Sequence, residues 1–144
     1  MQLSDDNRKS LLLTLHKQIE EYANATTSTI FQGKQLSFTY PPNGGLTEVE
    51  MQALEQLQGN EILMKALRKL LANTTAEVFF SFFNLIDGTT SPDVTTGKWS
   101  EVLLVDKPYD FEEDLPFLHD DFWETYWNWK DQRGDKGWSL DKLE

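Results

Sequence analysis

The segment from Ala76 to Ile86 constrains the fold most, because it leaves almost no polar face. Seven of its residues are large and apolar: Val78, Phe79, Phe80, Phe82, Phe83, Leu85 and Ile86. A helix that is apolar all round has to be covered by neighbouring elements. The sequence therefore predicts a central helix over 76–86 with other helices packed around it. A buried strand is the alternative at this place, since Val and Phe also favour strands.

Capping residues and helical spacing predict four further helices, which makes about five in all. The expected ranges are 4–24, 47–57, 60–71 and about 114–131. Ser4 and Asn60 are the expected caps of the first and third, and Thr47 with Glu50 forms a capping box for the second. Asp114 is the expected cap of the last helix, with Pro116 in its first turn. The threonine-rich tracts at 26–29 and 73–75 are expected to end or interrupt helices, because threonine has a low helix propensity.

Two segments have the patterns of strands. Residues 35–40 alternate polar and apolar side chains, and residues 99–105 include the nearly continuous apolar run 102–105. The predicted fold class is therefore α+β, mainly α, as a single domain. About five helices surround the Phe-rich central helix, and a small sheet of two or three strands completes the fold.

Charge and cysteine content exclude several classes of function. The chain has 24 acidic and 13 basic residues, a net charge of −11, which disfavours binding to nucleic acid or to an anionic membrane surface. It has no cysteine, so disulfides, zinc ribbons and thiol nucleophiles are excluded. The apolar run Val78–Ile86 is about half as long as a membrane helix, and the acidic start does not resemble a signal peptide. We therefore expect a cytoplasmic protein.

The C-terminal part of the chain combines acidic and aromatic residues. Residues 106–144 hold 12 of the acids but only 5 of the bases, together with nine of the 18 aromatic residues and four of the five tryptophans. On a helical wheel the rings of the last helix cover roughly 180°, which is wider than the apolar stripe of an ordinary surface helix. The rings outside an ordinary apolar stripe therefore have to be covered by another part of the chain or by a partner. The chain's own tail with Trp138, the connector 109–117 and a binding partner are the three alternatives.

These residues predict a binding surface. The candidate binding residues for a protein or a ligand are Trp123, Tyr126, Trp127, Asp120, Glu124, His119 and Trp138. Trp and Tyr are enriched at the centres of interfaces, and acids favour a basic partner. The sequence thus favours a protein-binding module, inhibitor-like, immunity-like or regulatory, that binds a basic protein. The alternative is a small-molecule binding or sensing domain in which the same aromatic residues line a pocket.

A third hypothesis is a small enzyme that uses His119 or Asp87 with nearby carboxylates. On the wheel, Asp120 and Glu124 project to the far side of the helix from His119, so a shared metal ion is not expected. Asp87 lies in a loop with turn-forming residues. No catalytic, cofactor-binding or phosphate-binding motif is present. We therefore predict no catalytic residue, no cofactor and no metal ligand, and the oligomeric state stays open.

Overall fold

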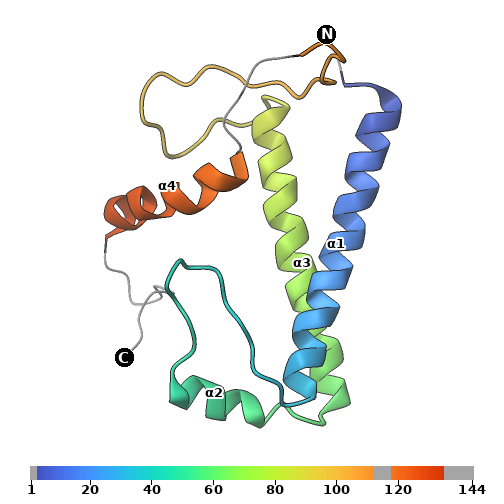
Figure 1. Cartoon of the computed structure of the whole chain (residues 1–144), viewed down its shortest axis with the longest axis vertical. Helices are drawn as coiled ribbons and strands as arrows, with labels where there is room; N and C mark the ends of the chain where they lie inside the picture. Colours follow the sequence, from blue (N-terminus) through green and yellow to red (C-terminus); the bar gives the residue numbers. More distant parts are fainter. Residues whose placement is uncertain (1–2, 112–117, 135–144) are drawn as a thin grey trace.

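The computed structural model describes residues 3–111 and 118–134, and its regular elements are all helices (Figure 1). The four helices are α1 (Asp5–Phe31), α2 (Glu48–Glu55), α3 (Glu61–Ile86) and α4 (Leu118–Arg133). α1 and α3 run antiparallel as a long hairpin and make the one extensive helix–helix contact among the described helices. The short α2 lies near the closed end of this hairpin, and α4 lies beside it.

The predicted α+β class is wrong, because no strand is present in the described part of the chain. Residues 35–40 and 99–105 both follow a non-helical path, but neither has a strand to pair with. A period-two pattern produces a strand only where a second strand supplies backbone partners. Here the two segments line cavities instead: Leu36 and Phe38 line one beside α2, and 102–104 line another at the open end of the hairpin, where these three side chains stay exposed.

The described residues form four helices rather than five, because the two expected over 60–71 and 76–86 are one continuous helix, α3. Two residues of the tract 73–75 make side-chain hydrogen bonds within the helix: Thr75 Oγ1 donates to the Leu71 carbonyl at 2.8 Å, and Asn73 Nδ2 donates to Glu77 Oε1 at 2.9 Å. α1 likewise continues past 24 through 26–29, where Thr27 Oγ1 donates to the Ala23 carbonyl at 2.8 Å. Threonine is tolerated in a helix when its hydroxyl bonds back by one turn.

Three of the expected helix starts are confirmed. The Ser4 side chain accepts from the Asn7 backbone N–H, and the Asn60 side chain accepts from that of Leu63. Thr47 and Glu50 form a complete capping box, with a 2.7 Å bond from the Thr47 N–H to Glu50 Oε2. The expected cap at Asp114 and the proline at 116 lie outside the described residues. None of the four helices combines the length and the apolarity that crossing a membrane requires.

The core of the hairpin is one narrow stripe of α1 packed against α3. It consists of Ile19, Ala23, Thr27 and Ile30, with Thr27 only 1% exposed. No residue of α3 is fully buried, and Val78, Phe80 and Phe82 are 63%, 69% and 47% exposed. The prediction that 76–86 forms a central, covered helix is therefore wrong for the described part of the chain: only α1 packs along α3 extensively.

Asp106 attaches the segment that follows α3 to the start of α1. Its Oδ1 accepts from the Asn7 side-chain amide at 2.8 Å and from the Ser4 backbone N–H at 3.2 Å. These bonds hold the pKa of the Asp106 carboxyl below its ordinary value of 3.8, and the bond from Asn7 has the largest effect. The attachment therefore stabilises the fold at pH values above the ordinary pKa. This stabilisation is lost as the pH falls through the lowered pKa of the folded state.

We expect Asn7→Ala to raise the pKa of Asp106 back toward its ordinary value. The Asn7 bond favours the ionised carboxylate, so its removal makes protonation easier. A carboxyl NMR titration of wild type and variant measures this midpoint. An Asp106 midpoint that is unchanged by Asn7→Ala would contradict the attachment.

Candidate functional site

Helix α4 is attached to the rest of the protein through the turn at Tyr40 and Pro41. The Tyr40 ring centroid lies 5.4 Å from that of Tyr126 in an edge-on arrangement, 6.1 Å from Phe122 and 6.4 Å from Trp123. Pro41 is buried. The turn is closely packed, since a Cβ added at Gly44 would lie 2.6 Å from Pro41 Cγ. A single aromatic residue, far from α4 in sequence, therefore positions this helix.

Tyr126 is the inward-facing residue of α4. It is 5% exposed, and its hydroxyl is buried without a hydrogen-bond partner among the described residues. Its ring packs edge-on against Tyr40 and, at 5.4 Å, against Trp127. Tyr126 thus belongs to the attachment of α4 and offers little surface to a partner.

Two tryptophans and two acids form the exposed flank of α4 next to this attachment. Trp123 and Trp127, one turn apart, are 40% and 43% exposed. Residues four positions apart on a helix are neighbours, so Asp120 and Glu124 form a parallel row beside them, and both are exposed. We call these four residues, Trp123, Trp127, Asp120 and Glu124, the tryptophan–acid face.

Two residues of this region were missed by sequence reasoning. Asp131 follows Trp127 by four positions and extends the acidic border of the tryptophan–acid face. The same spacing rule that placed Glu124 could have found it. Tyr40 was missed for a different reason, since nothing in the local pattern of 35–40 indicates a contact with residues more than eighty positions away.

His119 lies at the start of α4 and is largely exposed. Its Nε2 is 3.4 Å from Asp120 Oδ1, so the wheel-based expectation that Asp120 points to the far side is wrong. Adjacent side chains at the first turn of a helix can bend toward each other, which an idealised wheel does not represent. No group of three or more His, Asp or Glu residues that could hold a metal ion occurs in 3–111 and 118–134.

The possible covers of the α4 rings fall partly outside the described residues. Trp138, and Phe117 of the connector, are in that part. Of the connector residues that are described, Tyr109 is fully exposed and so covers none of the rings. Lys107 Nζ lies over the ring of Phe111, 5.2 Å from its centroid. Trp129, on the other flank of α4, is 40% exposed.

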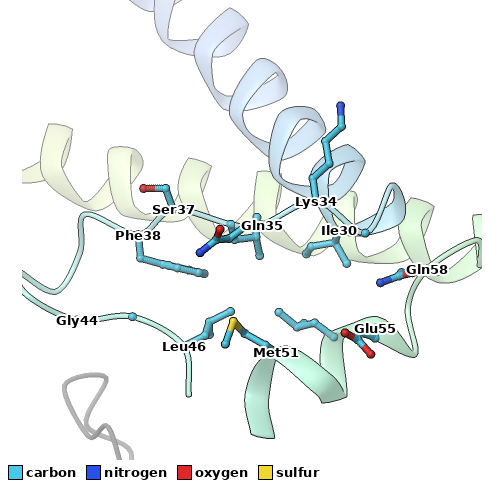
Figure 2. Close-up of a pocket in the computed structure, with 14 residues that line it drawn as sticks. Ile30, Lys34, Gln35, Ser37, Phe38, Gly44, Leu46, Met51, Glu55 and Gln58 are labelled. Carbon is cyan, nitrogen blue, oxygen red and sulfur yellow. The ribbon is translucent and has the colours of Figure 1, made fainter. Parts of the chain in front are cut away.

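A cavity of about 610 Å³ lies between the end of α1, the loop that follows it and α2. Figure 2 shows Gln35 and Phe38 on one side of it, facing Leu46 and Met51 on the other. Among the described residues, Phe38 is the one aromatic residue of its lining, and no α4 residue contributes. Trp123, Tyr126 and Trp127 therefore do not line this cavity, and Trp138 lies outside the described residues.

Asp87 ends α3 as its C-cap residue and lines a second cavity, of about 500 Å³, at the open end of the hairpin. The other polar residues of its lining are Glu101 and Arg8, and Arg8 is paired with Asp5 at 2.7 Å. Most of the remaining lining is apolar side chains of α1, α3 and 102–104. His119 is not part of this cavity, so the structure does not bring the two candidate catalytic residues to one site there.

The tryptophan–acid face is the site at which most of the candidate binding residues are brought together. Tyr126 lies beneath it, His119 lies next to Asp120, and Trp138 lies outside the described residues. Its geometry and charge are the basis for assigning a function. No protein-family model, no curated protein and no solved structure matches the chain.

Proposed function

We propose that this chain is a protein-binding module that uses the tryptophan–acid face of α4 to bind a basic protein in the cytoplasm, as an inhibitor-like, immunity-like or regulatory partner. One observation carries the proposal: two tryptophan rings, 40% and 43% exposed, lie one turn apart beside two exposed carboxylates. Tryptophan is enriched among the residues that dominate binding energy, because it combines a large apolar area with a polar N–H.

The charges support a basic partner. The net charge of −11 attracts a cationic protein over a distance and raises its association rate. Asp120 and Glu124 supply local partners for lysine or arginine at the border of the rings. The face of Trp127 also accepts a cation within the chain, since Lys130 Nζ lies 5.7 Å from its ring centroid. Lysine or arginine side chains of a partner suit this surface for the same reason.

A second candidate function is the binding of a small molecule in the cavity beside α2. Its volume of about 610 Å³ falls within the range of roughly 300–1,000 Å³ that is typical of ligand sites. Its lining joins apolar side chains such as Met51 with a few amides, including Gln35 and Gln58. This cavity is separate from α4, so the two functions respond to different substitutions.

We expect Trp127→Ala to weaken capture of the partner strongly and Trp129→Ala to leave it nearly unchanged. Trp129 is the matched control because it lies on the same helix and is 40% exposed, but on the other flank. Loss of a dominant interface tryptophan costs about 2 kcal/mol or more, which is about 30-fold in Kd. The measurement is a pull-down from host extract with tagged protein, followed by titration of the captured protein.

Salt and charge reversal separate this proposal from non-specific adhesion. Glu124→Lys should lower the association rate and reduce its salt dependence, whereas Glu48→Lys, on the exposed start of α2, should change both much less. An acidic captured protein, or equal losses with Trp127→Ala and Trp129→Ala, would overturn the proposal. Binding that is lost only when the α2 cavity is altered would favour the second candidate function.

A further inference from the structure

The segment 35–38 has backbone groups without a backbone partner. The N–H and carbonyl groups of these residues make no hydrogen bond with another backbone group in 3–111 and 118–134. In the sequence, residues 35–40 alternate polar and apolar side chains, which is the pattern of a strand with one buried face. A row of unpaired backbone donors and acceptors is a template for a second strand. The segment is therefore suited to pairing with a strand that the described chain does not supply.

The same segment forms one wall of the cavity beside α2. Residues 33–38 all line this cavity, and residues 44–46 line it from the other side. Figure 2 shows the side chains of Lys34 and Ser37 directed away from Leu46, which lies across the cavity. Both residues nevertheless line the cavity, so their backbone borders it. The unpaired donors and acceptors therefore belong to the wall of a preformed cavity.

The opposite wall also permits the approach of another backbone. Gly45 has no side chain, and a Cβ added there would meet no described atom within 4 Å. Glycine allows a main chain to come close. The backbone groups of Gly45 and Leu46 likewise make no backbone hydrogen bond within the described part of the chain. Unpaired backbone on both walls, with apolar side chains such as Phe38 and Met51 along them, suits an extended polypeptide better than a small molecule.

We propose that the cavity beside α2 binds an extended peptide segment of another protein, which adds as a strand to residues 35–38. In this mode of recognition, main-chain hydrogen bonds supply affinity, and pockets for alternate side chains supply specificity. The volume of about 610 Å³ is that of a ligand site. The cavity shares no residue with the tryptophan–acid face, so this inference goes beyond the function proposed for α4 and does not depend on it.

The lining indicates the chemistry of the peptide. Its apolar members, among them Leu36, Phe38 and Leu54, favour apolar side chains at alternate positions of the peptide. Its described charged members are Lys34 and Glu55, and Lys34 points away from the opposite wall (Figure 2). The Glu55 carboxylate and the net charge of −11 therefore favour basic side chains at the other positions. A synthetic peptide in which valine and lysine alternate has both properties and serves as the probe.

The valine–lysine peptide is titrated into the full chain and followed by NMR. We expect the backbone amide signals of residues 35–38 to shift and their hydrogen exchange to slow, because these amides become donors to the added strand. The same peptide with N-methylated backbone amides keeps its side chains and charge but loses its donors, so its Kd should be about 10-fold higher or more. Equal Kd values for the two peptides would overturn strand addition.

Two variants locate the peptide on the chain. Phe38→Ala removes an aromatic side chain of the lining and should raise the Kd of the peptide about 10-fold or more. Phe38 is 42% exposed, so the fold tolerates the change. Trp127→Ala is the control: it removes a ring of the tryptophan–acid face and should leave this Kd unchanged. The reverse pattern would place the peptide on α4 and overturn the cavity as its site.

Hydrogen exchange of the free chain tests the other possible occupants of the cavity. Amides of 35–38 that already exchange slowly in the free monomer would show that the chain itself pairs with them. Slow exchange only in a species of twice the 16.7 kDa chain mass would assign the cavity to a second copy. Either result would overturn the proposal, as would unshifted amides of 35–38 at about 1 mM peptide. None of these results affects capture of a basic protein through Trp127.

Discussion

Replacing Ile19 by alanine should lower the free energy of unfolding by about 2–5 kcal/mol, whereas Leu13→Ala should change it by less than about 0.5 kcal/mol. Both residues lie on α1, but Ile19 is 9% exposed at the contact with α3 and Leu13 is 69% exposed. Removing Ile19 beyond its Cβ loses apolar burial and leaves a cavity between two long helices. Removing the Leu13 side chain exposes nothing new.

The expected loss of unfolding free energy is a large share of the total stability because the core is small. In 3–111 and 118–134 the buried apolar side chains are those of Ile19, Ala23, Ile30, Pro41 and Tyr126, and only the first three belong to the hairpin. A loss of 2–5 kcal/mol is a large share of the roughly 5–15 kcal/mol that stabilises a typical domain. Urea unfolding of both variants and wild type, at one protein concentration, measures the difference. Equal midpoints for the two variants would show that the α1–α3 contact is not the core.

Signals that act within one turn of a helix could be read from the sequence. Ser4, Asn60 and the pair Thr47 and Glu50 cap helices as expected, because a cap depends only on a side chain and the N–H groups three positions on. The polar tracts at 26–29 and 73–75 gave the wrong result. Low propensity costs a fraction of a kcal/mol per residue, and hydroxyls bonded to carbonyls one turn back, together with packing of α1 on α3, outweigh it.

The missing sheet has another cause. The patterns at 35–40 and 99–105 state which side chains prefer burial, but not what will bury them. In the structure the two segments belong to loops at opposite ends of the hairpin, and each lies against helices. Strand pairing depends on the position of a second strand, which is a property of the whole fold that the alternation of one segment does not contain.

The candidate site was predictable only in part, because the pattern of one segment does not contain its contacts with distant segments. Helical spacing alone indicates that Trp123 and Trp127 lie in one row with Asp120 and Glu124 beside them. It does not indicate which side of α4 faces inward. That choice is made by Tyr40, which packs on Tyr126 and so leaves Trp127 outward. The wheel also failed locally, at His119 and Asp120, where side-chain bending brings two adjacent residues within 3.4 Å.

Tyr40→Ala should detach α4 while the hairpin stays folded. The substitution removes three ring contacts, to Phe122, Trp123 and Tyr126. At about 0.5–1.5 kcal/mol each, the three contacts together contribute about 1.5–4.5 kcal/mol to holding α4. We expect a red shift of the tryptophan fluorescence and a loss of near-ultraviolet circular dichroism. The helical signal should change little, because the α1–α3 contact does not include Tyr40.

Phe38→Ala is the matched control for this experiment. Phe38 lies in the same loop and is 42% exposed, against 41% for Tyr40, but it lines the cavity beside α2 and has no ring contact with α4. It should leave the fluorescence nearly unchanged, and an equal shift in both variants would show that the loop, not the Tyr40 ring, positions α4. Tyr40→Ala should also weaken capture of the basic partner although Tyr40 is not part of the tryptophan–acid face, because a detached α4 has to be ordered again before it binds.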